Sequence, residues 1–195
     1  MASDTGPLDA GAAPPRRCRD AAERRVLIDR AIALGVPRDY GHQRDLQPQR
    51  EPSRLVAIGR NVHDRVQWLQ PHAARALARM REAAIGDGIE LEVVSAFRSI
   101  EYQLGILEAK LARGQSIDEI LRVSAAPGYS EHHSGRCADL TTPGFAALEE
   151  IFEQSPAFAW LQDRAGSFGF GLSYPRDNRH GITYEPWHWC WRTKR

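Results

Sequence analysis

Hydrophobic positions recur at helical spacing in much of this chain and alternate in a few shorter segments. Between Asp20 and Leu34 apolar residues recur every three or four positions, and Gly35 with Pro37 predicts the end of this helix. Pro71 fits the first turn of a second, strongly periodic helix. The predicted helices cover residues 20–34, 71–86, 99–114, a short stretch after Ser116, 143–152 and 157–165.

Strand signals are fewer and follow turn residues. Residues 89–94 alternate and include β-branched side chains, and residues 136–141 are apolar enough for a buried strand. The segments 169–174 and 182–189 are predicted as closing strands. Helices and strands mix without a βαβ rhythm, so we predict an α+β fold with a small antiparallel sheet flanked by helices.

The length and composition fit one compact domain. The chain has 195 residues, of which 42% are hydrophobic and 26% are charged. Residues 1–19 contain little to bury, so we expect a flexible tail followed by a single domain over residues 20–195. Residues 38–52 are polar and broken by prolines, which indicates a loop rather than a linker between two domains.

The charge distribution and the lack of long apolar segments argue against binding to nucleic acid or insertion into a membrane. The net charge is +1, with Lys and Arg scattered, so nothing indicates attraction to nucleic acid or anionic lipid. The first thirty residues lack the apolar run of a signal peptide, and no later segment is apolar enough to span a bilayer. We therefore expect no transmembrane segment and, as the sequence is written, a cytoplasmic protein, with the periplasm or cell envelope as the alternative.

The three cysteines do not form a recognisable pattern. Cys18, Cys137 and Cys190 cannot all pair with one another, and their spacing matches neither a disulfide scaffold nor a zinc ribbon. We expect mostly reduced thiols.

A short polar segment concentrates groups that bind metal ions. It holds His132, His133 and Asp139, and both imidazole nitrogen and carboxylate oxygen suit zinc. A catalytic zinc site needs three protein ligands and a fourth position left for water. We expect one of the three ligands to come from elsewhere in the chain, and His188 is the candidate. Glu185, three residues before it, could take a proton from water.

Each of these residues also has a structural interpretation. A histidine pair on a polar loop is commonly solvated or hydrogen-bonded. Asp139 in an apolar strand needs a partner, but an arginine would serve as well as zinc. Glu185 could belong to a structural ion pair, and the alternation of Trp187, Trp189 and Trp191 fits a half-buried strand that contributes to the core.

Two separated motifs carry a resemblance to a known family. The motif S-x-H-x-x-G-x-x-x-D is matched from Ser130 to Asp139, and E-P-W-H is matched from Glu185 to His188. Together they resemble the D-alanyl-D-alanine carboxypeptidase family of zinc peptidases. This group includes the vancomycin-resistance dipeptidases and carboxypeptidases and shares its fold with the Hedgehog signalling domain. The resemblance covers about residues 54–192.

The resemblance implies a zinc site with one Zn²⁺ per chain, held by His132, Asp139 and His188. It implies that Glu185 is the catalytic base. It selects His132 over His133, which is then expected next to the ligands or exposed.

The two cysteines in the matched region stand where the family usually has other residues. Cys137 replaces a small residue, commonly alanine, and we expect it not to bind the metal. Cys190 replaces arginine or another polar residue.

The resemblance also implies the substrate site. The segment 95–103 is similar to the family's strand-to-helix segment, whose arginine contacts substrate and is here Arg98. In this role Arg98 would stabilise the scissile carbonyl or its oxyanion. The expected substrate is a peptidoglycan peptide or precursor that ends in D-Ala-D-Ala. The expected groups that position it are Ser130 and Gln103, with Tyr174 and Trp187 as pocket walls.

Two other functions stay open on the sequence. An L-Ala-D-Glu endopeptidase of the endolysin type can use the same metal motif on an internal bond. A non-catalytic zinc module is the alternative from another class, because a fold does not fix a function. The sequence does not indicate an oligomeric state.

Overall fold

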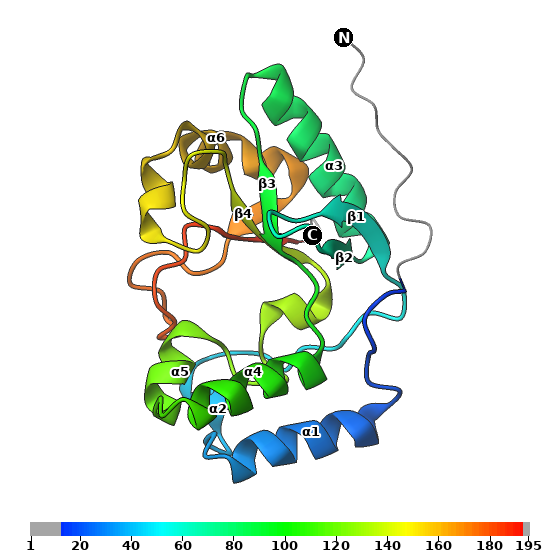
Figure 1. Ribbon diagram of the computed structural model, residues 1–195, viewed down its shortest axis with the longest axis vertical. Helices are drawn as coiled ribbons and strands as arrows, with labels where there is room; N and C mark the ends of the chain where they lie inside the picture. The colour runs from blue at the N-terminus through cyan, green and yellow to red at the C-terminus, as the bar shows by residue number, and fades with distance from the viewer. Residues whose placement is uncertain (1–12, 193–195) are drawn as a thin grey trace.

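The computed structural model describes residues 13–192 and combines helices with antiparallel sheet (Figure 1). The helices are α1 (Ala21–Ala33), α2 (Tyr40–Gln43), α3 (Pro71–Gly86), α4 (Ile100–Ala112), α5 (Ile117–Val123) and α6 (Pro156–Arg164). The strands are β1 (Val56–Arg60), β2 (Val66–Leu69), β3 (Glu92–Ser95), β4 (Cys137–Thr141), β5 (Phe170–Leu172) and β6 (His188–Trp191). Short 3₁₀ helices are η1 (Glu131–Ser134), η2 (Glu150–Gln154) and η3 (Ala165–Phe168).

The main sheet has the strand order β3-β4-β6-β5, and every neighbouring pair is antiparallel. β1 and β2 form a separate antiparallel hairpin. The predicted α+β fold with a small antiparallel sheet is therefore confirmed.

Two groups of buried side chains hold the fold together. One lies between the sheet, α3 and α6, with Leu69, Met80, Leu140, Phe152 and Leu161 fully buried. The other joins the helices α1, α2, α4 and α5. Figure 1 shows these two parts as an upper half, which holds the sheet, and a lower half made of helices. The loop from β3 into α4 and the segment before β4 connect the halves.

Local capping explains where several helices start. The Asp20 side chain accepts a hydrogen bond from the backbone N–H of Glu23 at the start of α1. Ser99 caps α4 in the same way. Ser116 and Glu119 form a capping box at the start of α5, in which each side chain bonds the other's backbone N–H.

Some predicted elements were wrong. Residues 143–149 form turns rather than a helix, because Gly144 and Leu148 have φ of +87° and +60°, which a right-handed helix excludes. The predicted strand 182–189 begins only at His188, after a turn that contains Pro186. The hairpin of β1 and β2 was not predicted, and α2 lies within the predicted loop 38–52.

The start of the described chain lies against the rest of the molecule. Residues 1–12 of the predicted tail lie outside the described residues. Residues 13–19 form no helix or strand, but Arg17 donates hydrogen bonds to the carbonyl oxygens of Pro52 and Ser53 at 3.1 and 3.0 Å. The backbone N–H of Cys18 donates to Glu51. Over residues 13–192, no helix has both the length and the apolar character needed to cross a bilayer.

The cysteine prediction was wrong for two of the three residues. Cys137 and Cys190 form a disulfide, whereas Cys18 is free. The residues are 53 positions apart in sequence, but the pairing of β4 with β6 places them directly opposite, with Cα atoms 4.0 Å apart. Spacing along the chain could not reveal this register.

We expect Leu140→Ala to lower the free energy of unfolding by about 2–5 kcal/mol, because Leu140 is fully buried in β4 and its removal leaves a cavity. Ile85→Ala is the matched control. Ile85 on α3 is 65% exposed, so its loss should cost less than about 0.5 kcal/mol. Urea unfolding followed by circular dichroism measures both, and equal losses in the two variants would contradict this placement of the core.

Candidate metal and substrate site

The pairing of β4 with β6 places four reactive side chains on one face of the sheet. Asp139 lies opposite His188, and Cys137 lies opposite Cys190. Side chains two positions apart on a strand point to the same face, so these two pairs are neighbours. The residues that alternate with them on the two strands point to the other face and pack into the core: Ala138, Leu140 and Trp189.

His132 reaches the same point from η1. Its Nδ1–H donates to the carbonyl oxygen of Ala96 at 2.6 Å, since a carbonyl can only accept. Burial lowers the pKa of His132, which favours the neutral ring with no hydrogen on Nε2, and this Nε2 lies 3.2 Å from Asp139 Oδ2. On the other side of the carboxylate, His188 Nδ1 lies 3.0 Å from Asp139 Oδ1. All three side chains are buried.

Glu131 orients the second histidine. Its Oε2 lies 3.1 Å from His188 Nε2, and because an ionised carboxylate only accepts, this contact favours the hydrogen on Nε2. Burial raises the pKa of Glu131, but the hydrogen bond and the charge of His188, with smaller contributions from other neighbours, together lower it to about 2, so this carboxyl is ionised at neutral pH. The sequence analysis did not single out Glu131, although it lies between Ser130 and His132 in the first motif.

These contacts leave three electron-pair donors facing one point. The ligand atoms of His132, Asp139 and His188 all lie within 4.8 Å of one another. In the metal-free protein the His188 Nδ1–H donates to Asp139, and a divalent cation would take the place of that proton. Burial lowers the pKa of His188, but the hydrogen bonds to Asp139 and Glu131 raise it to about 10, so the surrounding carboxylates favour positive charge here. The donor set therefore fits a divalent metal such as zinc.

Glu185 lies beside this donor set. Its Oε2 is 3.8 Å from His188 Nδ1, and its side chain is only 13% exposed. Burial raises the pKa of Glu185 to about 7, and the charge of Asp139 acts in the same direction. A carboxylate with this pKa can accept and return a proton near neutral pH.

Arg98 approaches the donor set from the loop between β3 and α4. Its guanidinium donates to Gln103 Oε1 at 3.0 Å and to Ser95 Oγ at 3.3 Å, and it lies 3.8 Å from Asp139 Oδ2. The Gln103 side chain is buried and donates to Ser124 Oγ and to the Ala125 carbonyl oxygen. The structure therefore places Gln103 behind Arg98, where it orients the guanidinium.

His133 is buried and fixes the backbone at Arg98. Its Nδ1–H donates to the Arg98 carbonyl oxygen at 2.6 Å, and its Nε2 accepts from the Gly128 N–H at 3.1 Å. Burial lowers the pKa of His133 to about 3, so it stays neutral. His133 was expected either next to the metal ligands or exposed, and the structure places it in the buried position. Both of its ring nitrogens form hydrogen bonds, so neither is available to a metal.

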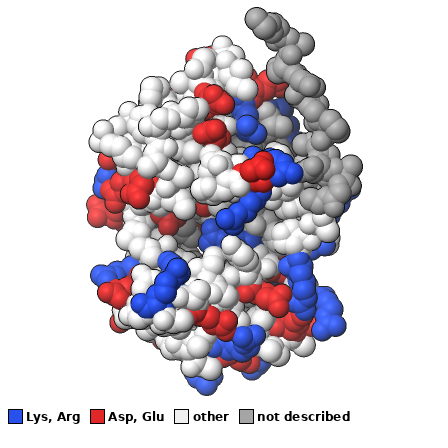
Figure 2. Space-filling view, in the orientation of Figure 1, with Lys and Arg blue, Asp and Glu red and all other residues white. Residues whose placement is uncertain are grey.

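A cleft of about 900 Å³ opens onto these residues. Ser130, Tyr174 and Trp187 line it, together with the metal-binding candidates. The Tyr174 ring lies 4.9 Å from the His188 ring. Basic side chains lie across the middle of the molecule, where the surface is hollowed between the two halves (Figure 2). Two of the basic residues that line the cleft besides Arg98 are Arg65 and Lys110.

Comparison with known proteins identifies the family. The sequence model of the VanY family, described as D-alanyl-D-alanine carboxypeptidase, matches residues 66–194. The chain therefore belongs to the VanY family of carboxypeptidases, which confirms the resemblance carried by the two motifs.

Individual relatives agree with this assignment. The protein YodJ of Bacillus subtilis is 35% identical over 148 residues, which are 71% of this chain and 53% of YodJ. The chain thus spans about half the length of this relative. The structure of the LdcB LD-carboxypeptidase matches with a TM-score of 0.66 and 32% identity, covering 72% of this chain and 69% of LdcB.

Structures of VanY proteins have the same fold. VanYB in complex with D-Ala-D-Ala has a TM-score of 0.58 and 25% identity, covering 75% of this chain and 81% of VanYB. A VanY variant in complex with Zn(II) has a TM-score of 0.58 and 24% identity, covering 74% of this chain and 83% of that one.

We expect Glu131→Gln to weaken zinc binding by about 10–100-fold, because a neutral amide is a weaker acceptor for His188 Nε2–H than the carboxylate is and leaves the imidazole less basic. Competition with a chromophoric chelator measures the affinity. Glu108→Gln is the matched control, since Glu108 pairs with Arg30 on the surface of α4. Equal zinc affinity in wild type and Glu131→Gln would remove Glu131 from this role.

Proposed function

We propose that this chain is a zinc-dependent D,D-carboxypeptidase that hydrolyses the terminal D-Ala-D-Ala bond of peptidoglycan peptides. The observation that carries the proposal is the convergence of two histidines and one aspartate on a single point, with a carboxylate of raised pKa beside them. His132 Nε2, Asp139 and His188 Nδ1 would hold one Zn²⁺. A bound zinc ion polarises a carbonyl and acidifies water, so that hydrolysis can proceed at neutral pH.

Glu185 is the base in this proposal. It takes the proton of the attacking water and returns it to the amine of the departing D-alanine, which breaks the peptide bond with the proton count balanced. Its raised pKa suits both steps. The partial burial of Glu185 also keeps bulk water from competing for the proton.

Arg98 stabilises the negative charge that develops on the scissile carbonyl oxygen. Its planar guanidinium is held by Gln103 and Ser95, so its orientation is set before substrate binds. In this proposal Gln103 acts through Arg98. A direct contact of Gln103 with the peptide stays a prediction, as do contacts with Ser130, Tyr174 and Trp187.

The charge of the cleft supports removal of a terminal residue. A carboxypeptidase must bind a free terminal carboxylate, and Arg65 and Lys110 are cationic side chains in the same cleft. The complex of VanYB with D-Ala-D-Ala agrees with a substrate of this kind. An endopeptidase has no need for a cationic group at this place.

A second candidate is an L,D-carboxypeptidase, in which the released D-alanine follows an L residue. The similarity to LdcB, at 32% identity and a TM-score of 0.66, favours it. The metal site and Glu185 would act identically, because only the residue before the cleaved bond differs.

The disulfide bears on where the protein acts. Disulfides persist in oxidising compartments and are rare in the cytosol. The Cys137–Cys190 bond therefore favours the cell envelope, the expected alternative, as the place of action.

We expect Glu185→Ala to retain zinc and lose peptide hydrolysis by several orders of magnitude, because the base is lost while the ligands remain. His132→Ala and His188→Ala should lose both zinc and hydrolysis. Zinc content by mass spectrometry and kcat/KM on a D-Ala-D-Ala peptide measure the two effects. Full activity of Glu185→Ala would exclude this mechanism.

We expect the chain to release a single D-alanine from a peptide ending in L-Lys-D-Ala-D-Ala, and a chelator to stop the release. Mass spectrometry of products identifies the bond. Faster release from the matched peptide ending in L-Lys-D-Ala would favour the L,D-carboxypeptidase, and cleavage between L-Ala and D-Glu would favour the endopeptidase. Zinc binding without hydrolysis of any of these peptides would favour a non-catalytic zinc module.

A further inference from the structure

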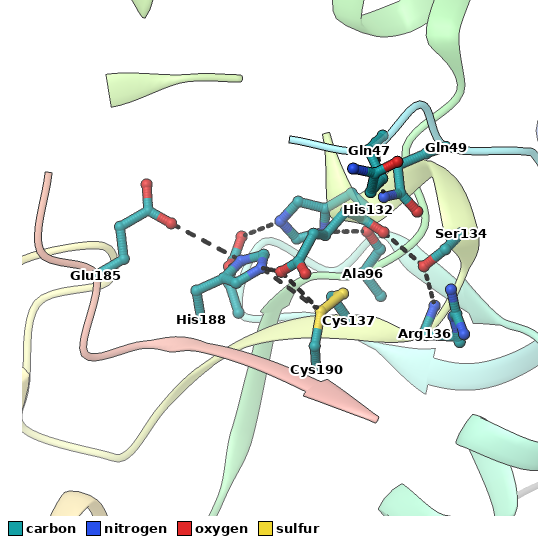
Figure 3. The surroundings of a disulfide bond; sticks show 12 residues. Gln47, Gln49, Ala96, His132, Ser134, Arg136, Cys137, Glu185, His188 and Cys190 are labelled. Carbon is teal, nitrogen blue, oxygen red and sulfur yellow. Dashed lines mark hydrogen bonds and ion pairs between the residues drawn. A yellow bond between two sulfur atoms is a disulfide. The ribbon is translucent and has the colours of Figure 1, made fainter. Parts of the chain in front are cut away.

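A second group of metal-binding side chains lies directly behind the first. Ligand atoms of Glu131, Cys137, His188 and Cys190 all lie within 4.8 Å of one another. Cys190 Sγ is 3.2 Å from Glu131 Oε2 and 3.7 Å from His188 Nε2. Figure 3 shows the disulfide beside the His188 ring, on the side away from Glu185.

The two groups use opposite nitrogens of one ring. His188 Nδ1 faces Asp139, whereas His188 Nε2 faces Glu131 and the sulfur atoms. In the oxidised protein the second group is incomplete, because disulfide sulfur is a poor ligand and the thiolate is the form that binds metals. Reduction supplies the two missing donors.

We propose that reduction of Cys137–Cys190 creates a second metal site, in which both thiolates, Glu131 and His188 Nε2 bind one thiophilic divalent ion, zinc or cadmium. Two thiolates, one imidazole and one carboxylate make a four-coordinate donor set that suits zinc. With Zn–S bonds of about 2.3 Å at tetrahedral angles, the sulfur atoms lie about 3.8 Å apart. The sulfurs must separate on reduction, which rotation of the two side chains permits.

The reaction balances with a dithiol as reductant. The dithiol is oxidised to its own disulfide, and the protein disulfide is reduced to two thiols. Metal binding then releases both thiol protons to solvent. His188 loses its Nε2 proton to solvent and keeps the hydrogen on Nδ1, which donates to Asp139 at 3.0 Å.

The second site excludes the first. A neutral imidazole has one lone pair, so His188 cannot bind both ions without losing its last proton. An ion at the thiolates therefore leaves His132 and Asp139 without their third partner. In this way the reduced protein would hold metal in an inactive form. Oxidation of the two thiols would release that ion and leave His188 available as a ligand of the catalytic ion. This consequence rests on the proposed function, whereas the existence of the thiolate site does not.

Cadmium binding to the full chain tests the site without any hydrolysis assay. The protein is reduced with a dithiol, freed of it anaerobically and titrated with Cd²⁺, and the ultraviolet charge-transfer band of cadmium thiolate is recorded. A Cys18→Ser background removes the third thiol. We expect the band in the reduced protein, its loss in the oxidised protein, and its loss in the added double variant Cys137→Ser/Cys190→Ser.

Two control measurements show whether loss of the cadmium–thiolate band is due to loss of the thiols. Circular dichroism checks that the double variant is folded. Alkylation of the reduced Cys18→Ser protein should also abolish the band, because it blocks the thiols of Cys137 and Cys190 without replacing either residue. No band in the reduced protein, or a band that survives the double substitution or alkylation, would overturn the site. Native mass spectrometry should find one Cd²⁺ per reduced chain, and two would overturn the exclusion. Hydrolysis by the oxidised zinc enzyme would stand in either case.

Discussion

The antiparallel register of β4 with β6 is the constraint on which the site depends. It sets Asp139 opposite His188 and Cys137 opposite Cys190, and the alternation of strand side chains puts both pairs on one face. A shift of β4 by one residue would turn Asp139 into the core and bring Ala138 to the cleft, and the same shift of β6 would exchange His188 with Trp189. The buried side chains on the opposite face therefore secure the site, because they cannot be exposed without loss of the hydrophobic core.

Electrostatic balance is the second condition. Three carboxylates, Glu131, Asp139 and Glu185, surround His188 in a largely buried region. Unpaired, they would cost several kcal/mol each. Arg98 and the histidines offset part of this charge, and a divalent cation would offset the rest. Burial raises the pKa of Glu185, and the negative charges of Asp139 and Glu131 act in the same direction.

Local signals in the sequence predicted much of this arrangement. Helical periodicity located α1, α3 and α4 to within a few residues, because it depends on residues close in sequence. The two motifs selected His132, Asp139 and His188, and the structure brings these residues together. What the sequence did not predict depends on contacts between distant segments or on backbone conformation. The disulfide follows from strand register, and the turns at 143–149 follow from two positive φ angles.

The role of Glu131 was missed for the same reason, since its partner His188 lies 57 residues away. We propose that His132 Nε2, Asp139 and His188 Nδ1 together hold one zinc ion. Anomalous diffraction at the zinc edge from crystals of the oxidised protein tests it most directly. A single strong peak at about 2.0–2.2 Å from these three atoms is the predicted result. A peak on the Nε2 side of His188, or no peak in protein that hydrolyses the peptide, would contradict it.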